Sequence, residues 1–455
     1  MKGLYIESYG CQMNVYDSLM MEDILRPLGF AVVPTPESAD IILINTCHIR
    51  EKASEKLYST LGRMRKIRKK ECVLVVAGCV AQAEGAAVFE RAPFVDVVVG
   101  PQGIHTLPDL IMKVKRDKQI NIEFPVVSKF DAISLDRRAN GGISAYVSVQ
   151  EGCDKFCTFC VVPYTRGPEY SRPAEAVLEE IVQLVDRGTK EIVLIGQNVN
   201  AYHGTYKGNV IDLGKLIQMV AQIGGVERIR YTTSHPRDMH QSLYDAHKNE
   251  KKLAPFVHLP VQCGSNAVLK KMNRKHTVQE YIDIIDKLRS ARRDIAFSSD
   301  FIVGFPGETA KDFEDTMSLV RNVGFAMSYS FKYSPRPGTP GAEYPEQVNE
   351  EEKNTRLRAL QDLLLEQQTT FNKRMEGMVM DVLVGSKDNS MKNGKIFGKS
   401  DYSQSVLISV DDERETHFNR TLKVKITEGY RNILTGHIHS ESMDTELSSL
   451  LQVAT

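Results

Sequence analysis

The sequence lacks the features that mark secreted and membrane-embedded proteins. No stretch of its 455 residues approaches the roughly 18 uninterrupted apolar residues of a membrane span. The first residues, Met1–Tyr9, predict a β-strand rather than the apolar core of a signal peptide. We therefore expect a cytoplasmic protein without membrane contact, in which cysteines stay reduced and serve metals or catalysis more often than disulfides.

The chain also lacks net charge, because 58 basic residues balance 58 acidic ones. This balance argues against nucleic-acid binding by the molecule as a whole, but local basic patches can still bind phosphate. Two such patches are Arg63–Lys70 and Lys270–Lys275, and the alternative for each is a solvated helix face. The hydrophobic fraction of 42% is typical of globular proteins, and the length predicts two to four domains.

Six of the eight cysteines form two groups of three, and each group lacks a fourth member. The compact group is Cys153, Cys157 and Cys160, and the dispersed group is Cys11, Cys47 and Cys79. Iron–sulfur cubanes normally use four thiolates, so three thiolates leave one iron open to a reactant. The alternatives are zinc or structural cysteines, but zinc needs a fourth Cys or His ligand, and the compact group has none nearby. Two open irons would let two reagents meet on one substrate.

Residues 1–125 alternate β-type runs with amphipathic segments, which predicts a parallel α/β sheet. The expected strands are Leu4–Ser8, Ile41–Asn45, Val73–Ala77 and Val95–Val99. Cys11, Cys47 and Cys79 each come just after one of these strands. Ligands bind at the carboxyl edge of open α/β sheets, so these cysteines are expected to converge there.

Residues 126–142 lack apolar periodicity and predict a linker, and residues 143–348 form the next expected domain. Its expected strands are Ala145–Gln150, Glu191–Gly196, Arg228–Thr232, Phe256–Val261, Ile295–Val303 and Met327–Tyr333. Their alternation with helical segments favours a partial (β/α)6 barrel over a flat sheet. Barrel active sites lie at the C-terminal ends of the strands, and the compact cysteine group follows the first strand.

Residues 349–376 predict a long charged linker helix, with Asn349 as its cap. Residues 377–440 contain short alternating strands, which predict a small β-barrel of a kind that often binds RNA. Residues 441–455 are expected to be a disordered tail. The whole chain is thus expected to be a multidomain α/β protein: a parallel sheet, a partial barrel and a small β-barrel.

The compact cysteine group, with spacing C-x3-C-x2-C, resembles the signature of radical S-adenosylmethionine (SAM) enzymes. The resemblance extends over nearly the whole chain to the methylthiotransferase family, and the C-terminal barrel resembles the RNA-binding TRAM domain. The motifs that carry it are Gly10–Asn14, Asn45–Cys47, Ala77–Gln82, Cys157–Arg172, Gly196–Asn200, Ser234–Pro236 and Asp300–Thr309. Two departures are Pro168, where a charged residue is common, and Cys263, where relatives usually have Ser.

The resemblance implies two [4Fe–4S] clusters, one on each cysteine group, with SAM bound at the open iron of the compact group. Expected SAM contacts are Gln197, Asn198, Gln262 and Asp300, although each could simply line the site. Arg166 and Arg172 could neutralise a carboxylate or a phosphate. No acid–base catalytic residue is assigned. Cys72 and Cys263 are most simply core residues, and Cys263 could alternatively reach the mouth of the site.

The Gly10–Asn14 motif is similar to the tRNA branch of the family, which acts on N6-isopentenyladenosine next to the anticodon. The resemblance implies insertion of a methylthio group at carbon 2, with one SAM as methyl donor and another as radical source. The expected partners are such a tRNA and an electron donor such as flavodoxin or ferredoxin, and the protein is expected to be a monomer. Expected phosphate contacts are Arg63–Lys70, Lys392, Lys395, Lys399, Lys423 and Lys425.

Two alternatives stay open at this point. One is a sister methylthiotransferase that acts on threonylcarbamoyl-adenosine or on a ribosomal protein. The other is a non-catalytic iron–sulfur protein that binds RNA.

Overall fold

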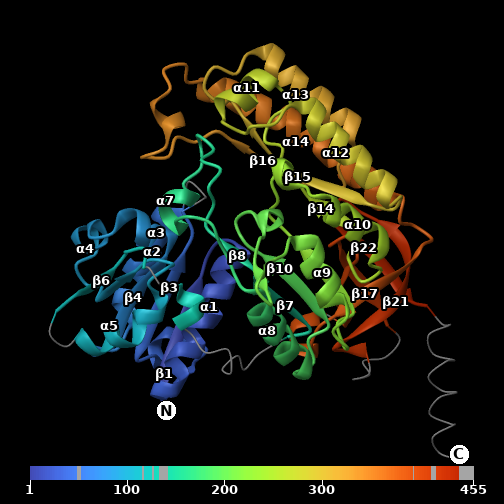
Figure 1. Ribbon diagram of the computed structural model, residues 1–455. Helices are drawn as coiled ribbons and strands as arrows, with labels where there is room; N and C mark the ends of the chain where they lie inside the picture. The colour runs from blue at the N-terminus through green and yellow to red at the C-terminus, as the bar shows by residue number, and fades with distance from the viewer. Residues whose placement is uncertain are drawn as a thin grey trace, which may run out of the picture.

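The computed structural model describes residues 1–48, 53–114, 117–125, 128–132, 142–392, 394–410 and 417–439. Figure 1 shows the N-terminal part in blue, the central part in green to yellow and the C-terminal barrel in red. The expected tail at 441–455 and most of the expected linker lie outside the described residues. Within the described ranges, no helix is long and apolar enough to cross a membrane.

The N-terminal part is a six-stranded parallel sheet with strand order β2-β1-β3-β4-β5-β6, which confirms the expected parallel architecture. Its strands are β1 (Lys2–Ser8), β2 (Phe30–Val32), β3 (Ile41–Thr46), β4 (Val73–Gly78), β5 (Val97–Val99) and β6 (Gln119–Asn121). Its helices are α1 (Gln12–Leu25), α2 (Ala53–Ile67), α3 (Cys79–Glu84), α4 (Ala87–Arg91) and α5 (Leu107–Lys113). Strand β3 is buried along its whole length, because apolar clusters cover both faces of the sheet.

The central part contains the six expected parallel strands, arranged as two three-stranded halves. One half is β7 (Ser144–Ser148), β10 (Glu191–Ile195) and β13 (Arg228–Tyr231), and the other is β14 (Phe256–His258), β15 (Ala296–Val303) and β16 (Met327–Lys332). The larger helices between them are α8 (Ala174–Asp186), α9 (Leu213–Ala221), α10 (Gln241–Asn249), α12 (Val278–Ala291) and α13 (Ala310–Val323). The expected partial barrel is confirmed, and one apolar cluster joins its strands to these helices.

Short elements complete the central part around the strand ends. They are β8 (Gln150–Glu151), α7 (Val162–Arg166), β9 (Tyr170–Ser171), β11 (Thr205–Tyr206), β12 (Asn209–Val210) and α11 (Asn266–Lys271). Strands β8 and β9 pair antiparallel, which closes the segment that carries the compact cysteine group.

Helix α1 joins the N-terminal sheet to the partial barrel. Met13 and Tyr16 of α1 share one apolar cluster with Val193 and Ile195 of β10. The Met13 sulfur lies 3.8 Å from the Ser148 hydroxyl of β7. The short helix α6 (Lys129–Ala132) falls inside the segment expected to be a linker. Thus the first helix of the chain covers the β7–β10 half of the barrel.

The long helix α14 (Glu350–Lys373) leads from the partial barrel to the C-terminal barrel. Asn349 caps it, since its side chain accepts a hydrogen bond of 2.8 Å from the Glu352 amide. The C-terminal elements are β17 (Val379–Val384), α15 (Lys387–Ser390), β18 (Met391–Lys392), β19 (Lys395–Ser400), β20 (Ser405–Ser409), β21 (Arg420–Gly429) and β22 (Ile433–Ile438). The order β17-β21-β22-β20-β19 returns to β17, so the expected small barrel is closed.

Two arginines of β13 bind the C-terminal barrel to the central part. Arg230 donates to the carbonyl oxygens of Ser400 and Asp401, each at 2.7 Å. It also pairs with Glu191 at 2.8 Å, and Arg228 pairs with the Asp401 carboxylate at 2.5 Å. Guanidinium groups are suited to such multiple contacts because their donors are held in a rigid plane.

Candidate functional site

The dispersed cysteines meet at one edge of the N-terminal sheet, as expected from the sequence. Cys11 precedes α1, Cys47 follows β3 and Cys79 is the first residue of α3. Strands β1, β3 and β4, which lead to them, are adjacent in the sheet. Gly10 has φ of +126°, and a Cβ atom there would lie 2.3 Å from Cys47 Cβ. Only glycine therefore lets the segment before Cys11 approach Cys47 so closely.

Two asparagines fix the backbone behind these cysteines. The Asn14 side chain donates to the Tyr9 carbonyl oxygen at 3.0 Å, and Asn45 donates to the Asn14 carbonyl oxygen at 2.8 Å. The Cys11 thiol lies 3.6 Å from Asn14 Oδ1. Asn14 and Asn45 are both fully buried, so their hydrogen bonds are strong constraints on the position of the cysteine loops.

Arg166 is a positive charge that acts on two cysteines of the dispersed group. A hydrogen bond with Cys47 lowers the pKa of Cys11 to about 6, and Arg166 acts in the same direction. Burial raises the pKa of Cys79, and Arg166 opposes this effect through its charge and a side-chain hydrogen bond. A positive group beside thiols favours the thiolate form, which is the form that binds metal.

The carboxylate partners of Arg166 and Arg172 are side chains of the protein itself. Arg166 pairs with Asp17 at 2.8 Å and with Glu151 at 2.5 Å. Arg172 pairs with Glu180 at 2.8 Å. All of these side chains are at least 98% buried. Arg166 therefore joins α1 to the central part, and Arg172 does so through a hydrogen bond of 3.2 Å to the Tyr16 hydroxyl.

The compact cysteine group occupies the loop between β8 and α7. Gly152, just before it, has φ of +74°, and Arg274 donates to the Cys157 sulfur at 3.5 Å. Burial raises the pKa of Cys153 to about 11 and that of Cys160 to about 12. Metal binding at this loop must therefore displace protons from these thiols.

The three thiols of the compact loop have the donor chemistry of an iron–sulfur cluster. In the ranges that the structure describes, no three His, Cys, Asp or Glu side chains converge as one metal ion would require. A cubane instead binds each thiolate at a different iron, so the sulfur atoms need not converge on one point. Three cysteines on one loop, with Arg274 beside them, are a suitable donor set for such a cluster.

The Gln197–Asn198 corner lies beside the compact cysteine loop. Gln197 Oε1 accepts from the Gly152 amide at 2.7 Å, so this side chain holds the loop. The amides of Gln197 and Asn198 both donate to Gln150 Oε1 at 2.9 Å. Asn198 donates to Asp238 at 2.8 Å, while its buried Oδ1 has no partner among the described residues. Asn198 thus keeps one acceptor for a ligand.

Gln262, which follows β14, is brought next to Asp300, which lies inside the neighbouring strand β15. The backbone N–H of Gln262 donates to the backbone carbonyl oxygen of Asp300 at 2.9 Å. Gln262 has φ of +76°, an uncommon backbone conformation for a side chain of this size. The Asp300 carboxylate lies 3.5 Å from His258 Nε2. These two residues therefore form one polar corner rather than two separate ones.

Sequence reasoning missed further polar groups of the barrel. The side-chain atoms Ser234 Oγ, His235 Nε2, His276 Nε2, Arg274 Nε and Tyr333 Oη are buried without a hydrogen-bond partner among the described residues. The rings of His235 and His276 lie 5.8 Å apart, and burial lowers the pKa of His276 to about 4. Buried unpaired polar atoms are costly unless a ligand or water satisfies them. The Ser234–Pro236 motif was the available signal, and nothing in the sequence pointed to His276.

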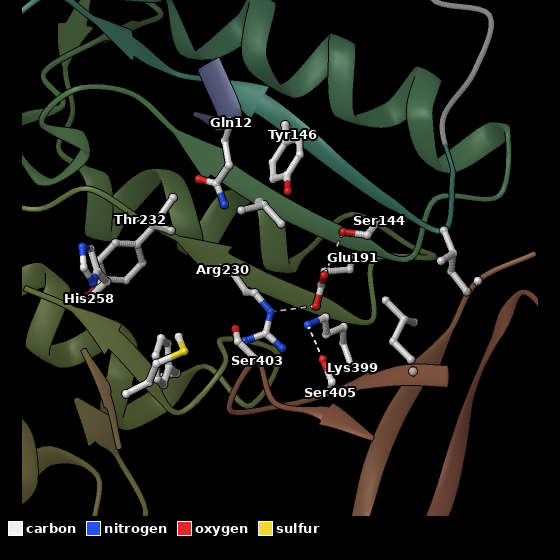
Figure 2. A pocket seen from close by; sticks show the side chains of 18 of the residues that line it. Gln12, Ser144, Tyr146, Glu191, Arg230, Thr232, His258, Lys399, Ser403 and Ser405 are labelled. Atoms are coloured by element: carbon white, nitrogen blue, oxygen red, sulfur yellow. Dashed lines mark hydrogen bonds and ion pairs between the residues drawn. The ribbon is translucent and has the colours of Figure 1, made fainter. Parts of the chain in front are cut away.

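A cavity of about 610 Å³ lies between the partial barrel and the C-terminal barrel. Figure 2 shows Tyr146 of β7, His258 of β14 and Thr232, which follows β13, with Lys399, Ser403 and Ser405 from the C-terminal barrel. Gln12, the neighbour of Cys11, also lines it. The cavity therefore reaches from the C-terminal barrel to the residue next to the dispersed cysteine group, and its size suits a ligand rather than a single water.

The expected phosphate contacts differ in how they are held. In the Arg63–Lys70 segment, Arg63 pairs with Glu7, Arg68 with Asp96 and Lys69 with Asp40, each at 3.0 Å. Lys423 pairs with Asp381 at 2.7 Å. Lys399 lines the cavity, where burial lowers its pKa, and the side chain of Lys392 lies outside the described residues.

Comparison with family models divides the chain in the same order as its fold. Residues 3–100 match the uncharacterized protein family UPF0004, residues 147–320 the radical SAM superfamily and residues 373–439 the TRAM domain. The matches fall on the N-terminal sheet, the partial barrel and the C-terminal barrel, respectively.

Known proteins match the chain over nearly its whole length. A tRNA-2-methylthio-N(6)-dimethylallyladenosine synthase of Anaplasma phagocytophilum (strain HZ) is 74% identical, covering 97% of this chain and 99% of that protein. Proteins with the same name are 64% identical in Ehrlichia chaffeensis (strain ATCC CRL-10679 / Arkansas) and 59% in Wolbachia pipientis wMel, each covering 96% of this chain and 99% of the other.

Solved structures resemble the fold at low sequence identity. The radical SAM methyltransferase TsrM of Kitasatospora setae, solved with cobalamin and a [4Fe-4S] cluster, is 12% identical with a TM-score of 0.56, covering 75% of this chain and 74% of that one. The cobalamin-dependent SAM radical enzyme OxsB is 14% identical with a TM-score of 0.50, covering 78% and 56%. At this identity the likeness concerns the fold alone.

Proposed function

Because this chain belongs to the tRNA-2-methylthio-N(6)-dimethylallyladenosine synthase family, we propose that it is a radical SAM tRNA methylthiotransferase. It transfers a methylthio group to carbon 2 of N6-isopentenyladenosine next to the anticodon. The observation that carries the proposal is 74% identity over 97% of the chain, together with two cysteine groups at strand ends. Nothing in the structure favours the alternative substrates or a non-catalytic role.

The radical SAM domain implies one [4Fe–4S] cluster and SAM, and in this proposal Cys153, Cys157 and Cys160 hold that cluster. Cys11, Cys47 and Cys79 would hold a second cluster, which would supply the sulfur. When bound, these groups supply a radical that activates an aromatic C–H bond and a sulfur that replaces the hydrogen. Gly152 and Arg274 orient the compact group, and Asn14 and Asn45 orient the dispersed one.

SAM binds where the barrel keeps unpaired polar atoms. Asn198 Oδ1 is an acceptor for the SAM amine, and Ser234 and His235 present further buried groups. Gln197 does not contact SAM itself. Its side chain accepts a hydrogen bond from the Gly152 amide and so positions the compact cysteine loop. Gln262 and Asp300 contact SAM from the opposite half of the barrel. The atoms of Asn198, Ser234 and His235 fit this role because a polar ligand would remove the cost of leaving them unpaired.

The tRNA binds across the C-terminal barrel, with the modified adenosine in the cavity of Figure 2. The target base must leave the loop stack to reach buried chemistry, and unpaired loop bases do so most easily. Lys399 is placed for a phosphate, since it lines the cavity beside Ser405. Lys395 of β19 and Lys425 of β21 are further phosphate contacts in this proposal. In contrast, three charges of the Arg63–Lys70 segment already pair within the N-terminal sheet.

The remaining parts of the proposal concern organisation. The domains run over 1–125, 143–348 and 377–440, with connecting segments at 126–142 and 349–376 and a tail at 441–455. The protein works as a cytoplasmic monomer and receives electrons from a small carrier such as flavodoxin or ferredoxin.

The test is an anoxic reaction with reconstituted protein, SAM and tRNA that carries N6-isopentenyladenosine. Mass spectrometry of the digested tRNA should show a gain of one methylthio group. Cys153→Ala should abolish SAM cleavage, whereas Cys47→Ala should spare cleavage and stop methylthiolation. Cys72→Ala is the matched control, because Cys72 is a buried cysteine outside both groups.

Two results would contradict the proposal. One is SAM cleavage without any modified nucleoside on the isopentenylated tRNA. The other is iron content of about four per chain rather than the about eight that two cubanes require.

A further inference from the structure

The two cysteine groups are connected by four buried charged side chains, which we call the charge square. They are Asp17 of α1, Lys129 of α6, Glu151 of β8 and Arg166 of α7. Lys129 pairs with Asp17 at 2.7 Å and with Glu151 at 2.9 Å, and Arg166 pairs with the same two carboxylates. Each side chain is at least 98% buried, and two positive charges balance two negative ones.

The sequence positions of Asp17, Glu151 and Arg166 show how the charge square links the two cysteine groups. Glu151 stands two residues before Cys153, and Arg166 stands six residues after Cys160. Their ion pair of 2.5 Å therefore closes the base of the compact cysteine loop. Asp17 lies on α1, whose N-terminal cap is Cys11. The square thus fastens the loop of one cysteine group to the helix that begins at the other.

Arg166 also reaches the dispersed cysteines themselves. Its Nη2 donates to Asn14 Oδ1 at 3.2 Å, and the same oxygen lies 3.6 Å from the Cys11 sulfur. Arg166 also lies near the Cys79 thiol, whose pKa it lowers against the larger, opposite effect of burial. Helices α3 and α7, which carry Cys79 and Arg166, pack together. The Arg166 guanidinium therefore links the compact loop to the dispersed group through its contacts with the other members of the charge square and with Asn14.

We propose that Arg166, supplied by the radical SAM domain, is a positioning residue for the dispersed cysteine site and makes that site depend on the compact loop. This inference rests on the proposed function, because it takes Cys11, Cys47 and Cys79 as ligands of a second cluster. Thiolate ligands bring negative charge into a site closed to water, and Arg166 faces them. The planar guanidinium can hold Asp17, Glu151, Asn14 and Cys79 together, which the single ammonium of a lysine cannot do.

The experiment uses full-length protein with Cys153, Cys157 and Cys160 replaced by Ala, so that only the dispersed group can bind a cluster. Arg166→Lys is compared in this background with Arg172→Lys, a matched control. Arg172 is equally buried and also joins the two parts, through Tyr16 of α1, but its other partners are Glu180 and Ser148. The readouts are iron release to a chelator, the midpoint potential of the remaining cluster and the melting temperature of the metal-free forms.

Arg166→Lys should speed iron release at least tenfold and shift the midpoint potential, whereas Arg172→Lys should change neither. The metal-free variants should melt at similar temperatures, which separates positioning from folding. Arg166→Gln should speed iron release further and lower the midpoint potential, because a positive charge beside the cluster is lost.

Equal iron release from Arg166→Lys and its parent would overturn the role of Arg166 and leave the proposed function intact. Equal effects of Arg166→Lys and Arg172→Lys would also overturn it, since they would indicate a general packing role. If the parent with intact Arg166 binds no cluster, the second cluster itself is wrong, and this inference fails with it.

Discussion

Replacing Arg230 with Ala should loosen the C-terminal barrel from the central part. Arg230 is 11% exposed and makes one ion pair of 2.8 Å to Glu191 and two hydrogen bonds of 2.7 Å to carbonyl oxygens of Ser400 and Asp401. Removing one partner of a buried pair costs about 3–5 kcal/mol. In Arg230→Ala, Glu191 still has Arg228 as an ion-pair partner at 3.4 Å. We therefore expect a free-energy cost at the lower end of that range. A loss of about 3 kcal/mol corresponds to roughly a hundredfold change in the opening equilibrium.

Hydrogen exchange with mass spectrometry measures this change directly. Peptides that contain Ser400 and Asp401 should exchange about a hundredfold faster in Arg230→Ala if they exchange through this opening. Peptides of the N-terminal sheet should keep their rates. Arg321→Ala is the matched control, because Arg321 is 52% exposed and pairs with Glu314 on the surface, where ion pairs contribute about 0–1 kcal/mol.

Unchanged exchange around Ser400 in Arg230→Ala would refute the reasoning. It would mean that the apolar and remaining polar contacts hold the barrel without this arginine. The same variant should bind tRNA more weakly but still cleave SAM, since the compact cysteine loop does not contact Arg230 in the described structure.

Three further predictions follow from buried groups. Gly152→Ala places a Cβ 1.9 Å from the Pro168 carbonyl oxygen at φ of +74°, so reconstituted iron should fall from about eight to about four per chain by chemical assay. The pKa of His247, which bonds Tyr231 at 2.8 Å, is lowered from 6.5 to about 3 by burial. The unfolded chain therefore binds a proton first as the pH falls, and this site should cost about 1.4 kcal/mol of stability between pH 7.5 and 5.5; His247→Gln should remove that slope in urea titrations. Burial raises the pKa of Cys263 to about 12, so iodoacetamide should label it only after unfolding, as read by mass spectrometry.

The regular parts of the fold could be predicted because their signal is local. The six barrel strands are short runs of apolar residues between helical segments, and all six are present. Strands β2 and β6 were missed because three residues, such as Phe30–Val32, carry too little periodicity to be recognised. The edge on which the dispersed cysteines lie followed from general rules of parallel sheets.

The connections between the parts could not be predicted, because they depend on distant partners. Lys129 lies in a segment without apolar periodicity, yet its side chain is fully buried between Asp17 and Glu151. Neither carboxylate is a neighbour of Lys129 in the sequence. Arg166 was expected to neutralise a ligand, and its role as an internal ion-pair partner became visible only when α1 and α7 were placed together.

The packing of α1 against the barrel has a consequence for the synthesis of the chain. Met13 and Tyr16 emerge early, but their partners Val193 and Ile195 are made some 170 residues later than the end of α1 at Leu25. At about 5–20 residues per second, this apolar surface waits about 10–30 s on the ribosome before it is covered. Arg166 is also absent during most of this interval. We therefore expect chaperones to hold the nascent N-terminal sheet, and iron loading of its cysteines to follow completion of the barrel.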